Sequence, residues 1–227
     1  MKYILRTPLI ILCFIIVIVL GFYIGYGISE DFLMLYSSKL TQLPVRYLLI
    51  AIILSSSSLV FKEQNGLAIC MRKKNFFNAI LNNIKYEVYI LLLIFSIFEI
   101  PIMLQNFSLF FQNFYFMLMM YLNDIIISLF ILSIVKSIDI FIKNRTTSCA
   151  IFLVILSIID ILLEHGNYFF FENIYFDMSY IFCLPYIYKN YVVLAIILII
   201  ITIFLNLLSI FLRIKKDFML NDVHEEN

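Results

Sequence analysis

The sequence predicts an all-α, polytopic membrane protein with six transmembrane helices and both termini in the cytoplasm. Hydrophobic residues make up 64% of the 227 residues and charged residues only 14%, whereas a soluble domain is about half apolar and a quarter charged. Six apolar runs come close to the length of about 20 residues that a helix needs to cross the hydrocarbon layer. They lack the strict alternation of barrel strands. We therefore expect residues 1–227 to form a single transmembrane domain.

The predicted spans follow from the positions of these apolar runs. They cover approximately residues 8–28, 46–61, 86–104, 115–135, 147–165 and 191–212. The first run follows a basic start, as in a signal peptide, but it is long enough to cross a bilayer and no small-residue cleavage site follows it. We therefore expect a retained first span.

The basic residues predict the orientation of the spans. Of the 16 lysines and arginines, 13 lie before span one, after span six, or in the connections that follow spans two and four. Only Lys39, Arg46 and Lys189 fall on the other side. Cytoplasmic loops carry the excess of basic residues in membrane proteins, so both termini are predicted to be cytoplasmic.

The outer connection at about residues 166–190 is long and aromatic. Between Tyr168 and Tyr191, eleven of 24 residues are Phe or Tyr. The connection is either an interfacial aromatic belt or a set of short helices that dip into the outer leaflet, where irregular backbone must be buried in protein or face water. We favour the short helices, because a belt does not need a segment of this length.

Four acidic residues lie in or next to the predicted spans, where an aspartate at a helix centre costs about 2.5–3.5 kcal/mol. They are Glu99 near the outer end of span three, Asp124 near the middle of span four, and Asp160 with Glu164 on one face of span five. Apart from Arg46 at the start of span two, no lysine or arginine lies in a predicted span, so we expect these acids to lack a cationic partner within the membrane part of this chain. Either they are structural, protonated or hydrogen-bonded to neighbouring helices, or they line a path for a cationic or polar solute that supplies the missing charge.

Several other classes of function find no support in the sequence. The two histidines, His165 and His224, are far apart, and the four cysteines show no paired spacing, so we predict no catalytic or metal site. No phosphate-binding loop is present, so no cofactor is expected in this chain, and the net charge of +1 gives no indication of nucleic-acid binding. Gly21 and Gly25 form a small-xxx-small pair that predicts a helix contact, within the chain or between protomers.

The inner connection at about residues 62–85 is basic and then amphipathic. Phe76, Phe77 and the apolar residues after them recur at helical spacing, and asparagines fill the other face. This pattern predicts a helix at the cytoplasmic surface that runs into span three. The preceding cations, Arg72, Lys73 and Lys74, either serve only as topological determinants or also contact a partner.

This segment resembles the inner loop of type-2 ABC exporter permeases, the small six-helix subunits common in Gram-positive bacteria. Many of them carry the pattern R-x-x-S-R-K-K followed by an aromatic residue. The matching residues are Arg72, Lys73, Lys74, Phe76 and Phe77. Met71 and Cys70 stand where the family usually has Ser. The stretch RIKKDFM at residues 213–219 resembles a C-terminal ending frequent in these permeases.

The resemblance implies a non-enzymatic permease of the bacterial plasma membrane. In this family the loop after span two docks into a separate ATP-hydrolysing subunit, which would hold the ATP and Mg, so residues 66–82 would be the docking element. Two permeases, either two copies or a pair of homologues, assemble with two ATPases. Such exporters move amphipathic or hydrophobic solutes, often peptides, for toxin export or for self-protection against antimicrobial peptides. The exporters of phenol-soluble modulins are one such group.

Two other functions remain open from the sequence. The solute-binding membrane subunit of a vitamin or metal importer also has about six helices, but it often carries an alanine-rich face on its first span. Residues 9–21 of this chain, LIILCFIIVIVLG, contain no alanine, which argues against that alternative. The other is a non-transporting membrane protein such as an assembly or sensor subunit.

Overall fold

The structure is a computed structural model of the chain that describes residues 8–27, 31–62, 76–142, 144–166, 178–187 and 191–225. Within these ranges, side chains are described except at residues 8–10, 56–62, 76–83, 145, 162–166, 178–180, 187, 210 and 213–225. All regular secondary structure in the described ranges is helical, which confirms the predicted all-α class.

Each predicted span overlaps one helix of the structure. The α-helices are α1 (Pro8–Gly25), α2 (Phe32–Thr41), α3 (Leu43–Lys62), α5 (Phe76–Gln105), α6 (Phe107–Gln112), α7 (Phe114–Ile142), α8 (Arg145–Gly166), α9 (Leu184–Ile187) and α10 (Tyr191–Glu225), and a 3-10 helix, η2, covers Met178–Cys183. Helices α5, α7 and α10 extend well beyond the predicted spans. A count of apolar residues stops at a charged residue, whereas a helix continues through one.

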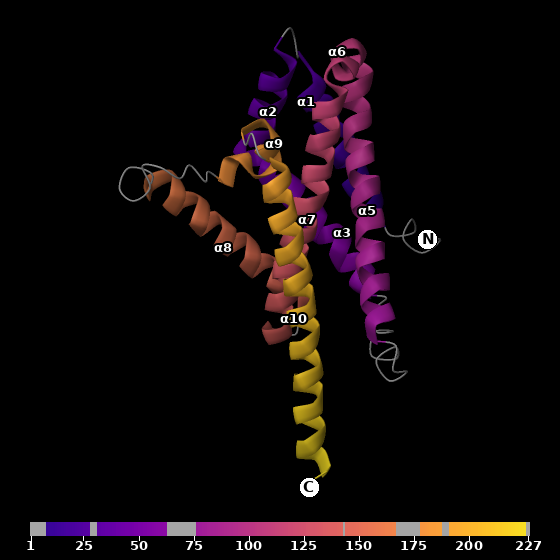
Figure 1. The fold of residues 1–227 in the computed structure, drawn as a ribbon, viewed down its shortest axis with the longest axis vertical. Coiled ribbons are helices and arrows are strands. Elements are labelled where there is room, and N and C mark those ends of the chain that lie inside the picture. The colour runs from indigo at the N-terminus through magenta and orange to yellow at the C-terminus, as the bar shows by residue number, and fades with distance from the viewer. Residues whose placement is uncertain are drawn as a thin grey trace.

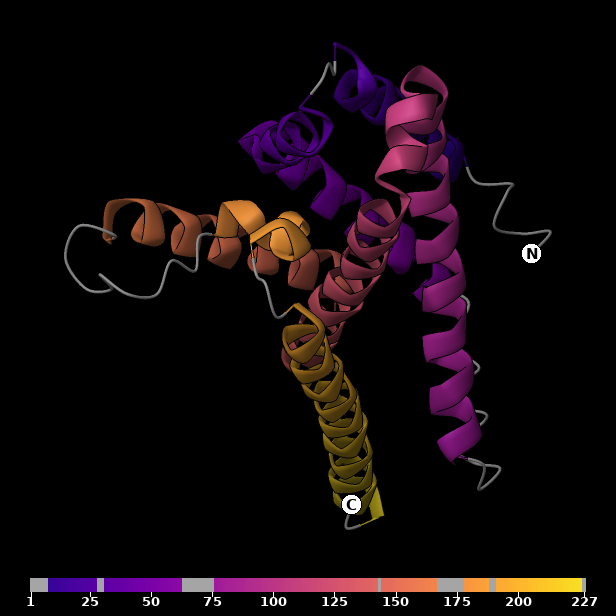
Figure 2. The same ribbon diagram turned by 45° about the horizontal axis from the view of Figure 1, so that its top comes forward.

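Two helix pairs form the body of the molecule. Helix α1 packs along α5 and α10 packs along α7, while α5 and α7 contact each other and α3 contacts both (Figure 1). The start of α5 and the ends of α7 and α10 lie at one end of this bundle, and α2 and α6 lie at the other (Figure 1). Helix α8 leaves the end of α7 at a steep angle and extends to one side, as Figure 2 shows from a second direction.

Three helices contain stretches that are long and apolar enough to cross a membrane. These stretches are Ile84–Gln105, Phe114–Ile142 and Tyr191–Ser209, and shorter apolar stretches cover Ile11–Gly25, Leu43–Ser55 and Thr146–Ile161. The structure is therefore compatible with membrane insertion through α5, α7 and α10. Crossing by all six helices, and the side on which each terminus lies, stay predictions.

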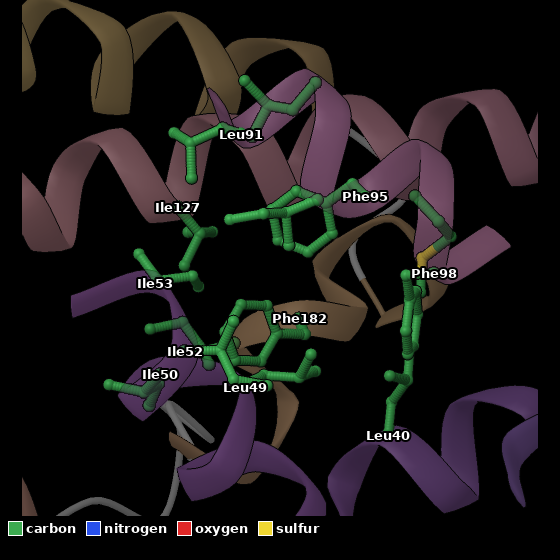
Figure 3. Packing of buried hydrophobic residues seen from close by; sticks show 14 of the residues in the cluster. Leu40, Leu49, Ile50, Ile52, Ile53, Leu91, Phe95, Phe98, Ile127 and Phe182 are labelled. Atoms are coloured by element: carbon green, nitrogen blue, oxygen red, sulfur yellow. The ribbon is translucent and has the colours of Figure 1, made fainter. Parts of the chain in front are cut away.

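Buried apolar side chains from five elements meet at the centre of the bundle. Figure 3 labels Leu40 of α2, Leu49, Ile50, Ile52 and Ile53 of α3, Leu91, Phe95 and Phe98 of α5, Ile127 of α7, and Phe182 of η2. Phe182 is fully buried, so the described part of the aromatic connection contributes to the core of the protein. In its described part, residues 178–187, this connection consists of the short helices η2 and α9. The secondary structure therefore agrees with the interpretation of this connection as short helices. How deeply these helices lie in a membrane stays a prediction.

Helix α2 lies in the connection between α1 and α3, where the sequence predicted no helix. It begins at Phe32, after the exposed Asp31, and its Lys39 reaches back to the last turn of α1. The Lys39 ammonium donates to the carbonyl oxygens of Ile24 at 3.0 Å and Tyr23 at 3.3 Å, and also to that of Tyr26. The last carbonyl groups of a helix have no hydrogen-bond partner within the helix. Lys39 supplies the donor that these carbonyl groups of α1 lack, and this contact fixes α2 beside α1.

Gly21 and Gly25 lie close to the backbone of α5. A Cβ atom added at Gly21 would lie 2.5 Å from the carbonyl oxygen of Phe98 and 3.1 Å from the Pro101 ring, and one added at Gly25 would lie 3.1 Å from the Cα of Ile102. The Gly25 carbonyl also accepts a 2.8 Å hydrogen bond from the Asn106 amide. The predicted small-residue contact is thus found within the chain. Small residues permit such close packing of helices in lipid, where the hydrophobic effect does not drive helices together.

The substitution Gly21→Ala should destabilise the protein by about 1–3 kcal/mol, because the added methyl group meets the backbone of α5, which cannot rotate away. Thermal unfolding of the purified protein in detergent micelles, followed by circular dichroism, measures this loss. The substitution Val19→Leu adds bulk on the exposed face of α1 and should leave the unfolding midpoint almost unchanged. Equal midpoints for the two variants would contradict the close packing of α1 on α5.

Candidate functional site

Glu99 of α5 and Asp124 of α7 are buried on neighbouring helices. Glu99 is 8% exposed and Asp124 is 1% exposed, and the two carboxyl groups lie within electrostatic range of each other. We call this pair the acid centre. Of the four acids predicted to line a solute path, these two are brought together by the structure.

Tyr36 of α2 is the hydrogen-bond partner of the acid centre. Its hydroxyl group donates to Glu99 Oε1 at 2.9 Å, and the phenol is fully buried. Burial raises the pKa of Tyr36 well above its usual value, and the neighbouring Glu99 and Asp124 raise it further. Tyr36 is therefore a permanent neutral donor to Glu99. No pattern in the sequence pointed to this contact, because α2 itself was not predicted.

Two more elements, η2 and α10, complete the surroundings of the acid centre. Asn123, next to Asp124 on α7, donates from its amide to the Ile181 carbonyl of η2 at 3.2 Å. Cys183 of η2 and Tyr191 at the start of α10 both lie within electrostatic range of Asp124. Burial raises the pKa of the Cys183 thiol, and Asp124 raises it further, so this group is neutral. Side chains from α2, α5, α7, η2 and α10 thus gather around two carboxyl groups.

Several oxygen atoms of this site are buried without a hydrogen-bond partner. They are Glu99 Oε2, Asp124 Oδ1, Asn123 Oδ1 and the Tyr191 hydroxyl. No lysine or arginine of the described part of the chain forms an ion pair with Glu99 or Asp124. A buried polar group without a partner costs free energy of about 1–3 kcal/mol, and more for a charged group. These oxygen atoms are therefore free to accept a hydrogen bond from a further donor.

Asp160 of α8 does have a cationic partner, so the expectation that it lacks one is wrong. The Arg46 guanidinium donates to Asp160 Oδ2 at 2.6 Å, and the Tyr47 hydroxyl donates to the same oxygen at 2.8 Å. Arg46 is 4% exposed and belongs to α3, which begins at Leu43, three residues before the predicted span. An apolar count puts a charged residue at the edge of a span, whereas here the paired charge is buried. The Glu164 side chain lies outside the described residues.

The predicted ATPase-docking residues fall mostly outside the described part of the chain. Arg72, Lys73 and Lys74 lie in the undescribed segment 63–75, and Phe76 and Phe77 begin α5 with side chains that are not described. The helical pattern after residue 75 is confirmed to this extent: α5 starts at Phe76 and continues without a break into the predicted third span. The docking surface itself stays a prediction.

A second polar cluster joins α5, α7 and α10 and was missed from the sequence. The buried Lys136 of α7 donates to Glu87 Oε2 of α5 at 2.6 Å and to Asn206 Oδ1 of α10 at 3.0 Å, and the Asn206 amide donates to Ser133 Oγ at 2.7 Å. Sequence reasoning placed Lys136 in a cytoplasmic connection as a topological determinant. The apolar residues that continue after it, Ile138 and residues 140–142, were the available signal.

The acid centre and the ion pair between Lys136 and Glu87 both depend on how α5 is aligned along α7. The acid centre lies twelve residues from the ion pair on both helices, at Glu99 relative to Glu87 and at Asp124 relative to Lys136. Twelve helical residues rise about 18 Å. Because α5 and α7 run in opposite directions (Figure 1), the pairing of Lys136 with Glu87 brings Glu99 to the level of Asp124.

The chemistry available at the acid centre is the binding of a proton or of a cationic or hydrogen-bond-donating group. The described residues contain no group of three or more His, Cys, Asp or Glu side chains that could hold a metal ion. Comparison of the chain with protein-family models, with curated proteins and with solved structures gives no match in any of the three. The function is therefore argued from the site alone and from the resemblance of the inner loop.

Replacing Lys136 with Met should lower the free energy of unfolding by about 3–5 kcal/mol, because Glu87 is then buried without its cation. The double variant Lys136→Met, Glu87→Gln should recover part of this loss, since no charge remains buried. Thermal unfolding in detergent micelles measures both changes. Lys85→Met removes the same charge from an exposed side chain on α5 and should have little effect. A loss for Lys85→Met as large as that for Lys136→Met would contradict the structural role of the buried ion pair.

Proposed function

We propose that this chain is the transmembrane subunit of an ATP-driven exporter that moves amphipathic or hydrophobic solutes, with cationic peptides as the first candidates. The acid centre is the observation that carries the proposal. Two buried carboxyl groups with unpartnered oxygens and no paired lysine or arginine in the described region lower the stability of the fold. A protein that only has to fold gains nothing from them. A cationic group of a passing solute offsets that cost and is bound by the same interaction.

The continuity of α5 offers a mechanical link between an ATPase and this site. Helix α5 begins at Phe76, directly after the basic segment 72–74, and reaches Glu99 without interruption. The distance along the helix from Phe76 to Glu99 is about 35 Å. A displacement imposed at the start of α5 by a docked ATPase is carried by the helix to the acid centre, because a helix transmits motion as a rigid element. The proposal places ATP hydrolysis and Mg in the partner.

A six-span topology with cytoplasmic termini completes the proposal. The start of α5 and the ends of α7 and α10 share one end of the bundle (Figure 1), and the basic residues after spans two, four and six belong to these same ends of the chain. Positive charge favours the cytoplasmic side, which is also where an ATPase meets the chain. The outer end then holds α2, α6 and the aromatic connection. The assembly contains a second permease, identical or homologous, in the plasma membrane.

Reversal of Arg72, Lys73 and Lys74 to Glu, combined with Phe76→Ala and Phe77→Ala, should release the ATPase from the permease. The reversed charges repel acids on the partner, and the aromatic anchors that dominate interface energies are lost. Co-purification of the tagged chain with candidate ATPases from the membrane measures the complex. Reversal of Lys215 and Lys216 changes basic residues at the same predicted side and should leave the complex intact. Retention of the ATPase by the fivefold variant, with the protein still inserted, would show that docking lies elsewhere.

The substitution Asp124→Asn should reduce export of a cationic amphipathic peptide by at least about tenfold, because a loss of about 1.4 kcal/mol of solute binding corresponds to that factor. Efflux from loaded vesicles containing the permease with its ATPase measures the rate. Asp31→Asn removes an exposed charge that makes no side-chain cap bond on α2 and serves as the control. Unchanged efflux for Asp124→Asn would remove the acid centre from the solute path.

A further inference from the structure

The acid centre contains more hydrogen-bond acceptors than donors. Glu99 Oε2, Asp124 Oδ1 and Asn123 Oδ1 are buried acceptors without partners, while the Tyr191 hydroxyl is the only unpartnered group beside them that can donate. The Tyr36 hydroxyl is already used on Glu99 Oε1, and one of the two amide hydrogens of Asn123 is used on the Ile181 carbonyl, so that the second is available to Asp124. With both acids ionised, two donors would face three acceptors. At least one oxygen would stay buried without a hydrogen bond, at substantial cost.

The surroundings also lack positive charge. The titratable groups that face the pair are Tyr36 from α2, Cys183 from η2 and Tyr191 from α10, and none of these can carry a positive charge. The buried cations of the described region are engaged elsewhere, since Arg46 of α3 binds Asp160 and Lys136 of α7 binds Glu87. Two neighbouring carboxylates in an apolar interior cannot both stay ionised under these conditions.

A proton corrects both deficits in one step. A protonated carboxyl group has one O–H donor and keeps its remaining acceptor capacity. A proton on Asp124 or Glu99 turns one of the three unpartnered acceptors into a donor for another. The same proton removes one negative charge from the pair, as in other pairs of carboxyl groups that share a site.

We propose that the acid centre holds a proton while it is empty and releases it when the cationic group of a solute enters, so that solute binding is coupled to proton release. The charge balances, because one positive group enters as one proton leaves to water. The inference rests on the proposed function, since it concerns the same site and the same class of solute. It adds that pH controls loading of the site.

The coupling between proton release and solute binding sets the direction in which the affinity changes with pH. Protons compete with the solute for the carboxyl oxygens, so the affinity for a cationic solute rises as the pH rises. By thermodynamic linkage, release of one proton makes the affinity rise about tenfold per pH unit over the range in which the centre titrates. A neutral solute of the same shape displaces no proton, and its affinity does not follow this slope.

The test uses the full chain in lipid nanodiscs without an ATPase. The probe is an N-acetylated amphipathic helical peptide whose only positive charges are trimethyllysines, which carry no titratable proton. Binding is measured by fluorescence anisotropy at pH values on both sides of neutrality, and proton release by an indicator dye in weak buffer. We expect an affinity that rises about tenfold per pH unit and one proton released per bound peptide. A peptide with glutamine in place of trimethyllysine should release none.

Matched variants assign the proton to the acid centre. Glu99→Gln and Asp124→Asn should abolish both the pH slope and the proton release, whereas Asp124→Glu should keep them and Asp31→Asn should leave them as in the unaltered chain. Binding with the same affinity at every pH and without proton release would overturn the inference and leave the proposed function standing. Failure of the cationic peptide to bind at any pH would overturn both. Persistence of proton release in both amide variants would place the proton elsewhere.

Discussion

The ion pair between Lys136 and Glu87 sets the register on which the rest of the bundle depends. Both side chains are buried, and the ammonium group also binds Asn206 of α10. A buried pair of this kind adds little net stability relative to apolar residues, but separating its members is costly. The helices α5, α7 and α10 are therefore held at one relative height. Sliding α5 by one turn against α7 would leave both charges without a partner.

The buried serine hydroxyl groups of α7 and the amide nitrogen of Asn123 also find acceptors within the protein. Ser128 and Ser133 donate to carbonyl oxygens four residues earlier in their own helix, which is the usual solution for hydroxyl groups in apolar helices. Asn123 instead reaches the backbone of η2 and draws the aromatic connection into the core beside Phe182. Helix α2 is fixed in turn, because its Tyr36 reaches Glu99. Short segments that would not be stable alone are thus held by polar contacts to long helices.

The sequence was sufficient for features that depend on composition along the chain and insufficient for those that depend on pairing. Apolar length located six helices, because each run of apolar residues reports directly on a helix. It placed Lys136 outside a span and put Arg46 at the very start of the second span, because a charged residue marks the edge of an apolar run even when its partner lies in the bundle. The partners, Glu87 and Asp160, are 49 and 114 residues away. No local pattern encodes such contacts, nor the approach of Tyr36 to Glu99 from a helix that was not predicted.

The difference between the two buried polar sites separates structure from function. In the cluster around Lys136, the cation has an anion, and the amide of Asn206 binds both Lys136 and Ser133, so charge is balanced within the protein. In the acid centre the charges have the same sign and the unpartnered atoms are mostly acceptors. A charge-balanced network rigidifies the fold even though Glu87 Oε1 has no hydrogen-bond partner, whereas a site with two groups of the same sign carries a free-energy cost that a proton or a cationic ligand relieves. Because the first cluster fixes α5 and α7 at one end, that cost cannot be relieved by moving the two carboxyl groups apart along the helices.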